Sequence, residues 1–197
     1  MNIDTFSIII VIFVLLISYR MYNNSDLFQL KCIISDVDGQ KYCVRERAKL
    51  NLAADRLAMV NANMSSIVDY CVEKYPNKDN VKRLEKGYNP KKIMETLPTS
   101  EYTAYSENKG EKLAFCLDTK KNSQGKLIDL NTLTFVAIHE LAHIATKSIG
   151  HTPEFWANFK FLLIQAEKIN VYKPIDYKNN PQEYCSMQIT DNPYFDS

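Results

Sequence analysis

The chain has 197 residues, a formal net charge of +1 at pH 7 and 24% charged residues. This length accommodates one ordinary domain with a short appendage and excludes two full domains. A net charge this close to zero excludes attraction to nucleic acid or anionic membranes through the overall charge of the molecule. The densest basic stretch, residues 74–92, is interrupted by Asp79 and Glu85, which is typical of a solvated face. We therefore expect no nucleic-acid partner.

The amino-terminal segment has the composition of a membrane anchor. The run from Thr5 to Tyr19 contains no charged residue. As a helix it would extend roughly 23 Å, so it spans a bilayer core of about 30 Å only if neighbouring apolar residues join it and Arg20 reaches the interface. A cleaved signal peptide would need a basic start and small residues at a cleavage site. Since neither is present, we predict a retained anchor, residues 1–22, followed by one domain, residues 23–197.

The charges that flank the anchor predict its orientation. Arg20 and Lys31 follow the apolar run, and no Lys or Arg precedes it. The positive-inside rule then predicts a single-pass, membrane-anchored protein whose main domain lies in the cytosol or the virion interior. Two N-x-S sequons, at Asn23 and Asn63, point to the opposite orientation, although such triplets are common by chance.

The cysteines show neither of the patterns that mark a cysteine-rich site. Their number is odd, and no C-x-x-C spacing occurs. This argues against a disulfide framework and against a zinc site made of cysteines alone. We expect reduced and mostly buried thiols at all five positions, which are Cys32, Cys43, Cys71, Cys116 and Cys185.

Two elements are predicted in the first half of the domain. Between residues 27 and 44, two apolar patches flank the turn pair Asp38-Gly39, which indicates either a small hairpin or a turn before a helix. Over residues 45–75, apolar side chains recur at steps of three and four, which predicts one long helix. Its single apolar stripe is interpreted as a surface that packs on the core.

A hairpin is predicted just before the histidines. The segments 101–106 and 111–118 lie on either side of Asn108-Lys109-Gly110, in which the glycine tolerates a positive φ. We therefore expect the β structure of the domain to precede the histidine motif directly.

Two helices are predicted after this hairpin. The first covers residues 129–150, with Asp129 as its N-cap and Gly150 at its end. The second starts at Thr152 and reaches about residue 170. The remaining tail has no sustained period, so we expect an irregular strap around the domain. Everything after the anchor is interpreted as one α+β unit.

All three histidines of the chain lie within the stretch HELAHIATKSIGHTPEFW. In its H-E-x-x-H frame, His139 and His143 are one helical turn apart and therefore face the same metal ion. Glu140 points about 100° away around the helix axis, where it suits the activation of a water molecule better than direct coordination. We predict His151 as the third ligand, because the turn at Gly150 reverses the chain. The alternative third ligand is Glu154, on the following helix.

These residues carry a resemblance to a known family. HELAH followed by GHTPEFW is similar to the SprT and WLM-type minimal zincins, the group that includes the Spartan-like DNA–protein crosslink proteases. Residues 102–184 resemble in particular an uncharacterised set of predicted metallopeptidases of large DNA viruses. That similarity lies in KGEKLAFCLD, IDLNTLTFVAIHELAHIATKSIGHTPEFWANFKFLL and YCSMQITDNP.

The resemblance implies a zincin-like minimal metallopeptidase domain of the α+β class: a long helix, a small sheet or hairpin, the HExxH helix and a following helix. It implies Zn²⁺ bound by His139, His143 and His151, with Glu140 as the catalytic general base. It also implies that the EKLAFCL strand is the edge of the sheet, along which an extended protein or peptide substrate lies.

We therefore expect a membrane-anchored, zinc-dependent peptidase that hydrolyses peptide bonds with a water activated by Glu140. The alternative is a non-catalytic, zinc-stabilised structural or virion-associated protein that retains the zincin fold. A third hypothesis, DNA-stimulated proteolysis, predicts DNA binding with a steep salt dependence.

Two further hypotheses concern residues of the tail. If all three histidines bind metal, the oxyanion of the reaction is stabilised by a tyrosine or by the metal itself, and the candidate tyrosines are Tyr172, Tyr177 and Tyr184. In the second hypothesis, the thiolate of Cys185 closes the fourth position of the metal and silences the enzyme.

Overall fold

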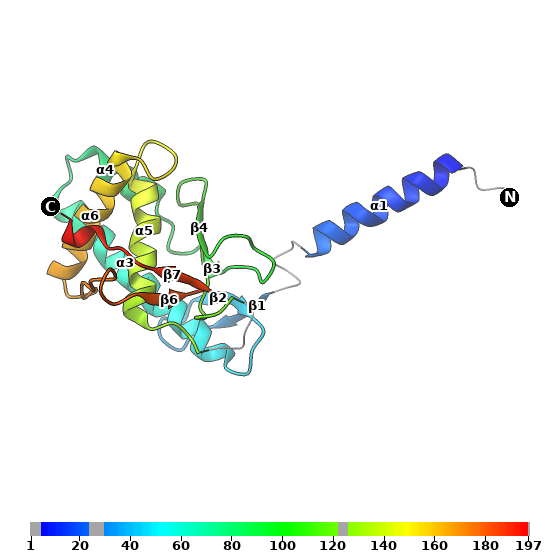
Figure 1. Ribbon diagram of the computed structural model, residues 1–197, viewed down its shortest axis with the longest axis horizontal. Helices are drawn as coiled ribbons and strands as arrows, with labels where there is room; N and C mark the ends of the chain where they lie inside the picture. The colour runs from blue at the N-terminus through cyan, green and yellow to red at the C-terminus, as the bar shows by residue number, and fades with distance from the viewer. Residues whose placement is uncertain (1–4, 24–29, 122–125, 197) are drawn as a thin grey trace.

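The computed structural model describes residues 5–23, 30–121 and 126–196. Within these ranges the chain forms a mixed α+β fold, as predicted, in which α3 and α5 pack against a five-stranded sheet (Figure 1). The elements in chain order are α1 (Thr5–Asn23), β1 (Leu30–Ile34), β2 (Lys41–Arg45), α3 (Leu50–Lys74), α4 (Asp79–Gly87), β3 (Ile93–Glu95), β4 (Ala104–Glu107), β5 (Lys112–Phe115), α5 (Leu130–Ala145), α6 (Pro153–Lys168), β6 (Gln182–Tyr184), β7 (Met187–Ile189) and the 3₁₀ helix η1 (Pro193–Phe195).

The helix α1 covers the predicted anchor. Its 19 residues extend about 28 Å at 1.5 Å per residue, close to the ~30 Å of a bilayer core. The segment Thr5–Tyr22 is long and apolar enough to cross a membrane, and none of it is buried against the rest of the protein (Figure 1). A signal sequence would share these properties. The helix therefore supports a membrane segment, while the domain boundary and the orientation stay predictions.

The sheet begins and ends with a hairpin. β1 pairs antiparallel with β2, from Leu30 opposite Arg45 to Ile34 opposite Lys41, which confirms the hairpin interpretation of this region. β3 is parallel to both β2 and β5. β4 pairs antiparallel with β5, which confirms the second predicted hairpin. The strand order is β1-β2-β3-β5-β4.

The expectation that the EKLAFCL strand forms the sheet edge is wrong. That segment contains β5, which lies between β3 and β4, and Leu113 and Phe115 on it are fully buried. Asn108, Lys109 and Gly110, all at positive φ, form the turn that connects β4 to β5. β4 pairs with the edge of β5 that faces away from β3. β4 is therefore the edge strand on this side of the sheet.

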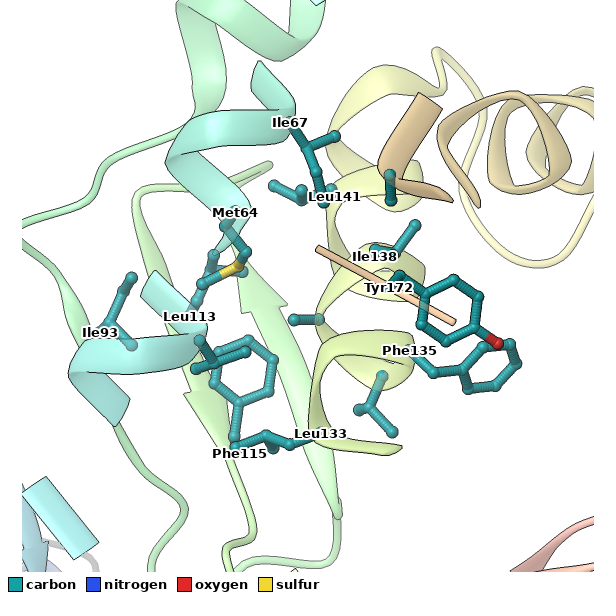
Figure 2. Close-up of a cluster of buried hydrophobic side chains, with 14 of the residues drawn as sticks. Met64, Ile67, Ile93, Leu113, Phe115, Leu133, Phe135, Ile138, Leu141 and Tyr172 are labelled. Carbon is teal, nitrogen blue, oxygen red and sulfur yellow. The ribbon is translucent and has the colours of Figure 1, made fainter. Parts of the chain in front are cut away.

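The long helix and the histidine helix form the centre of the core. α3 starts at Leu50, later than predicted, because residues 41–45 already belong to β2. Met64 and Ile67 of α3 pack with Leu141 of α5 and Leu113 of β5 (Figure 2). The basic stretch 74–92, interpreted as a solvated face, contains the helix α4, which was not predicted because Val81 and Leu84 are its only buried residues.

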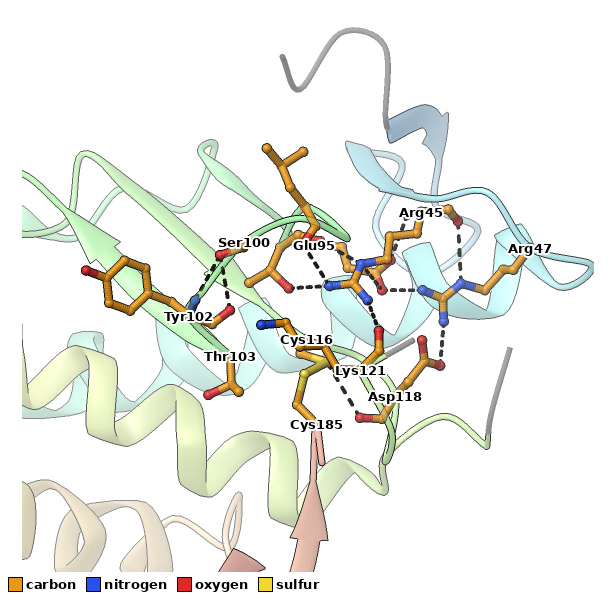
Figure 3. A network of polar contacts seen from close by, with 12 residues as sticks. Arg45, Arg47, Glu95, Ser100, Tyr102, Thr103, Cys116, Asp118, Lys121 and Cys185 are labelled. Carbon is orange, nitrogen blue, oxygen red and sulfur yellow. Dashed lines mark hydrogen bonds and ion pairs between the residues drawn. A yellow bond between two sulfur atoms is a disulfide. The ribbon is translucent and has the colours of Figure 1, made fainter. Parts of the chain in front are cut away.

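The expectation of reduced thiols is wrong for four of the five cysteines. Cys32 forms a disulfide with Cys43 across the first hairpin, and Cys116 forms one with Cys185 (Figure 3). Cys71 is free and buried in α3, where burial raises the pKa of its thiol to about 12. The longer pairing joins residues 69 positions apart in sequence, so local spacing gives no sign of it.

The tail is more regular than the predicted strap. β6 and β7 form a two-stranded hairpin whose turn residues, Cys185 and Ser186, have positive φ. The amides of these two residues donate to the carbonyls of Asp118 and Thr119, beside the Cys116–Cys185 disulfide. The hairpin is thereby attached to the segment that follows β5.

Candidate metal centre

The helix α5 presents two of the three histidines. The side chain of Asp129 accepts a hydrogen bond from the amide of Thr132 at 2.9 Å, so the predicted N-cap is confirmed. His139 and His143 are four positions apart on this helix, and their Nε2 atoms lie 3.2 Å apart. α5 ends at Ala145, five positions before the predicted glycine, and the chain then turns through residues 146–152.

The turn after α5 brings the third histidine back to the first two. The Nε2 atom of His151 lies 3.1 Å from the Nε2 atom of His139. The ligand atoms of all three side chains lie within 4.8 Å of one another. The structure therefore brings together the three predicted zinc ligands.

The geometry of the cluster fits a shared ion better than hydrogen bonds. The Nε2 atom of His139 is close to two other ring nitrogens, yet a neutral imidazole nitrogen has either one proton or one lone pair in the ring plane. One such atom makes one good hydrogen bond. Two nitrogens each about 2.05 Å from a tetrahedral zinc ion are about 3.3 Å apart, close to both observed separations.

Lys109 holds the turn that carries His151. Its ammonium group donates to the carbonyl oxygens of His143 at 3.0 Å, Thr146 at 2.8 Å and Ser148 at 2.8 Å. These carbonyls belong to the last turn of α5 and the start of the following loop, where a helix leaves acceptors unpaired and a cation is favourable. The hairpin turn between β4 and β5 thus supports the loop that leads to the third histidine.

Arg83 of α4 supports the same turn from a second side. Its guanidinium donates to the carbonyl of Ala145 at 2.7 Å and to the Glu154 carboxylate at 2.9 Å. The Glu154 carboxylate also accepts from the amide of Lys147 and the hydroxyl of Ser148. Glu154, the alternative third ligand, is therefore engaged with Arg83 and the turn, while His151 occupies the cluster.

Apolar aromatic side chains pack against the histidine rings. Phe155 and Phe159 of α6 lie against His139, with ring centroids 4.8 Å and 5.2 Å away. Burial, together with the neighbouring histidines, lowers the pKa of His139 to about 3 and that of His143 to about 4. Both rings are thus neutral near pH 7, which is the form that coordinates metal.

Glu140 is a buried carboxylate without a compensating cation among the described residues. It is 4% exposed, and burial raises the pKa of its carboxyl to about 8. Across the same residues, no hydrogen bond or ion pair to this carboxylate is found. Burial disfavours the charged form of an unpaired carboxylate, and a nearby positive charge favours it. A metal ion on the adjacent histidines would supply the missing positive charge.

Among the described residues, no contact is found between the hydroxyl of a candidate tyrosine and the histidines, but Tyr184 interacts electrostatically with Glu140. All three are at most 3% exposed. The hydroxyl of Tyr184 donates to the carbonyl of Thr103, and the hydroxyl of Tyr172 accepts from Asn192. Tyr177 packs edge-on against Phe135. Both hypotheses about the oxyanion therefore stay predictions.

The hypothesis that Cys185 closes the metal site is wrong for this structure. The sulfur of Cys185 is bonded to Cys116, so no thiolate is available to the histidines. Sequence reasoning also missed Lys109 and Arg83. The Asn-Lys-Gly turn signature placed Lys109 at a hairpin tip, but nothing in the sequence connects it, or Arg83, with α5.

Comparison with known proteins finds relatives in large DNA viruses. "Uncharacterized protein R325" of Acanthamoeba polyphaga mimivirus is 31% identical over 162 residues, which cover 80% of this chain and 81% of that protein. "Uncharacterized protein 136R" of Invertebrate iridescent virus 6 is 33% identical over 75 residues, 38% of this chain and 41% of that protein. "Uncharacterized protein 042R" of Invertebrate iridescent virus 3 is 38% identical over 71 residues, 36% of this chain and 43% of that protein. No family model matches, and no solved structure does.

Proposed function

The chain belongs to the family of large-DNA-virus proteins that includes mimivirus R325, and we propose that it is a zinc-dependent peptidase of the SprT and WLM-type zincin class. One observation carries the proposal: the Nε2 atoms of His143 and His151 both lie within 3.2 Å of the same atom of His139. The buried Glu140, next to His139 on α5, supports it.

The residues present fit a catalytic zinc ion. His139, His143 and His151 would hold it through neutral ring nitrogens, which leaves one position open for water or substrate. When bound, zinc supplies a Lewis acid that polarises the scissile carbonyl and lowers the pKa of water. Glu140 accepts the proton of the attacking water at its carboxylate and passes it to the leaving amine.

The edge strand β4 is the proposed position of the substrate. β4 packs against α5, the helix that carries two of the histidines, and it pairs with β5 along one edge only, so its other edge is unpaired in the described sheet. An extended peptide that pairs with this edge gains backbone hydrogen bonds without a requirement for a particular sequence. The proposed substrate is therefore an extended segment of a protein or peptide.

Peptide hydrolysis tests the proposal. Full-length protein in detergent, loaded with zinc, is incubated with a mixture of synthetic peptides, and the products are identified by mass spectrometry. We expect cleavage that falls by at least about 100-fold in Glu140→Gln, because a general base contributes that much. Glu85→Gln, which neutralises an exposed carboxylate on α4, is the matched control and should retain activity.

Two outcomes would contradict the peptidase proposal. Equal cleavage by wild type and Glu140→Gln would mean that a contaminating protease or another residue is responsible. A zinc-loaded wild type that cleaves no peptide would favour the alternative, a zinc-stabilised structural or virion-associated protein.

The proposal includes retention of α1 as a membrane anchor. Arg20 and Lys31 support a domain in the cytosol or the virion interior. The two disulfides support an oxidising compartment instead. The sequon at Asn63 carries little weight, because its amide is half-buried on α3 and donates to Thr134.

A further inference from the structure

A cleft lies away from the histidines, at the point where β2 leads into α3. It has a volume of about 450 Å³. Its lining combines four basic side chains with three apolar ones: Arg47, Lys49, Arg56, Lys126, Ala48, Leu52 and Leu127. None of these described lining residues is acidic, which distinguishes the cleft from the rest of a molecule whose net charge is only +1.

The acidic residues nearest in sequence are engaged elsewhere. Glu46 pairs with Lys31 of β1. Asp55 accepts hydrogen bonds from the hydroxyl of Ser35 and the amide of Asp36, in the first hairpin. Neither carboxylate therefore neutralises the cations of the cleft.

Arg47 forms a fixed wall of the cleft. Its guanidinium bridges the buried carboxylates of Glu95 and Asp118, and its side chain is only 9% exposed (Figure 3). Arg45 also forms an ion pair with Glu95. Because this network neutralises Arg47, the positive charge offered to a ligand comes from the other three basic residues.

The other three basic residues of the lining are open to an incoming anion. In the described part of the chain, no ion pair is found for Lys49, Arg56 or Lys126. Lys49 and Arg56 are also close to the first turn of α3, which contains no acidic residue and has no side-chain cap. The unpaired amides of this turn carry a partial positive charge, which attracts an anion together with the lysine and arginine side chains.

The cleft lies near the membrane segment along the chain. Leu30, the first residue of β1, is paired with Arg45, two positions before the first lining residue. Residues 24–29 connect α1 to β1, and six residues span at most about 21 Å. An anchor in the bilayer therefore keeps this end of the sheet close to the lipid headgroups.

We propose that this cleft binds a phosphate group, with Lys49, Arg56 and Lys126 as its ligands. The phosphate belongs either to an anionic lipid headgroup or to a soluble phosphate compound. Both sources offer the same chemistry, since phosphate oxygens accept charge-assisted hydrogen bonds from lysine and arginine. The exposed side chain of Leu52 would contact the apolar part of the ligand.

Amide hydrogen exchange of the full chain tests this site. The protein is placed in nanodiscs of phosphatidylcholine, and exchange in residues 45–57 is compared in inorganic phosphate and in chloride at equal ionic strength. Nanodiscs containing phosphatidylglycerol, without free phosphate, form the second arm. Amides that exchange only when the site opens are protected when a ligand binds the closed form. At a ligand concentration ten times the Kd, we expect the exchange of these amides to slow about tenfold.

The variant Lys49→Gln/Arg56→Gln should lose this protection. Lys82→Gln/Lys86→Gln removes the same charge from exposed positions of α4 and should keep it. Protection by inorganic phosphate identifies a soluble ligand, and protection by phosphatidylglycerol alone identifies a lipid headgroup. The proposal is overturned if neither arm protects the segment, if the cleft variant stays protected, or if both variants lose protection equally. Unchanged exchange in α5 verifies that the variants fold.

Discussion

Single residues outside the cluster determine where His151 lies. His151 is exposed and follows a loop rather than a helix, so its position depends on what holds that loop. Lys109 and Arg83 bind backbone carbonyls of the last turn of α5 and of the loop that follows it. These two residues would act on the metal through the position of its ligands, without contacting it.

We expect Lys109→Met to lower the free energy of unfolding by about 1–3 kcal/mol, because hydrogen bonds from a charged donor are lost. Zinc retention against a competing chelator should weaken as well, since the loop to His151 loses its support. Lys147→Met removes the same charge from an exposed position of the same loop and serves as the control. Similar chelator resistance in both variants would refute the positioning role of Lys109.

Gly110 meets two requirements, a positive φ and a close approach to the backbone of α4. A Cβ atom there would lie 2.3 Å from the carbonyl oxygen of Gly87, at the end of α4. Gly39 also has a positive φ, but a Cβ atom at that residue would meet nothing within 4 Å. Gly39→Ala should therefore cost about 1 kcal/mol from backbone strain alone.

Urea unfolding should show that Gly110→Ala costs about 1–3 kcal/mol more than Gly39→Ala, because overpacking adds to the strain. Equal losses in the two variants would mean that the hairpin turn and α4 separate easily. In that case the contact between these elements would contribute little to the support of the histidine cluster.

At the level of elements, sequence patterns predicted the helices and caps that depend on neighbouring residues. The 3.6-residue periodicity of α3 and the caps Asp129 and Thr152 of the two later helices are visible in the sequence and present in the structure. β3 has three residues and pairs only through distant contacts, so no periodicity reveals it. The position of β5 inside the sheet depends on β3 and was therefore missed.

For the candidate site, the sequence predicted the three histidines but not the residues that support them. The i, i+4 spacing and the helix stop at Gly150 predict that three histidines converge, and the structure brings them together. The supports of the site, Lys109 and Arg83, come from elements 34 and 62 positions away, and such contacts leave no local pattern.

The two disulfides should differ in their contribution to stability. They close loops of 11 and 69 residues, for which the chain-entropy relation gives about 3 and about 4 kcal/mol. Cys116→Ser/Cys185→Ser should thus destabilise the domain by roughly 1.5 kcal/mol more than Cys32→Ser/Cys43→Ser in chemical denaturation. A reversed order would show that the C-terminal hairpin is held mainly by its hydrogen bonds to Asp118 and Thr119.

At the scale of the whole molecule, α1 should behave as an anchor. Full-length protein should remain with membranes after carbonate extraction and should retain Met1 by mass spectrometry. Leu15→Arg/Leu16→Arg should release it, because an arginine near the centre of a membrane helix costs about 2.5–3.5 kcal/mol. Ser7→Thr, a change that preserves polarity, is the control. A mature chain that begins after residue 20 would identify a cleaved signal sequence instead.

The orientation of the domain follows from a protease-protection assay on sealed microsomes. A cytosolic domain is degraded by protease added outside, as Arg20 and Lys31 predict. Protection until detergent is added would place the domain in the lumen, where the two disulfides form readily.

The most direct measurement is the metal content of the full-length protein, by elemental analysis of wild type, Glu140→Gln and His151→Ala. We predict one zinc ion per chain in wild type and in Glu140→Gln, and much weaker retention in His151→Ala. His151 is exposed, so its loss should leave the circular dichroism spectrum unchanged. A folded wild type that purifies without zinc and takes up none on incubation would contradict the metal site and, with it, the peptidase proposal.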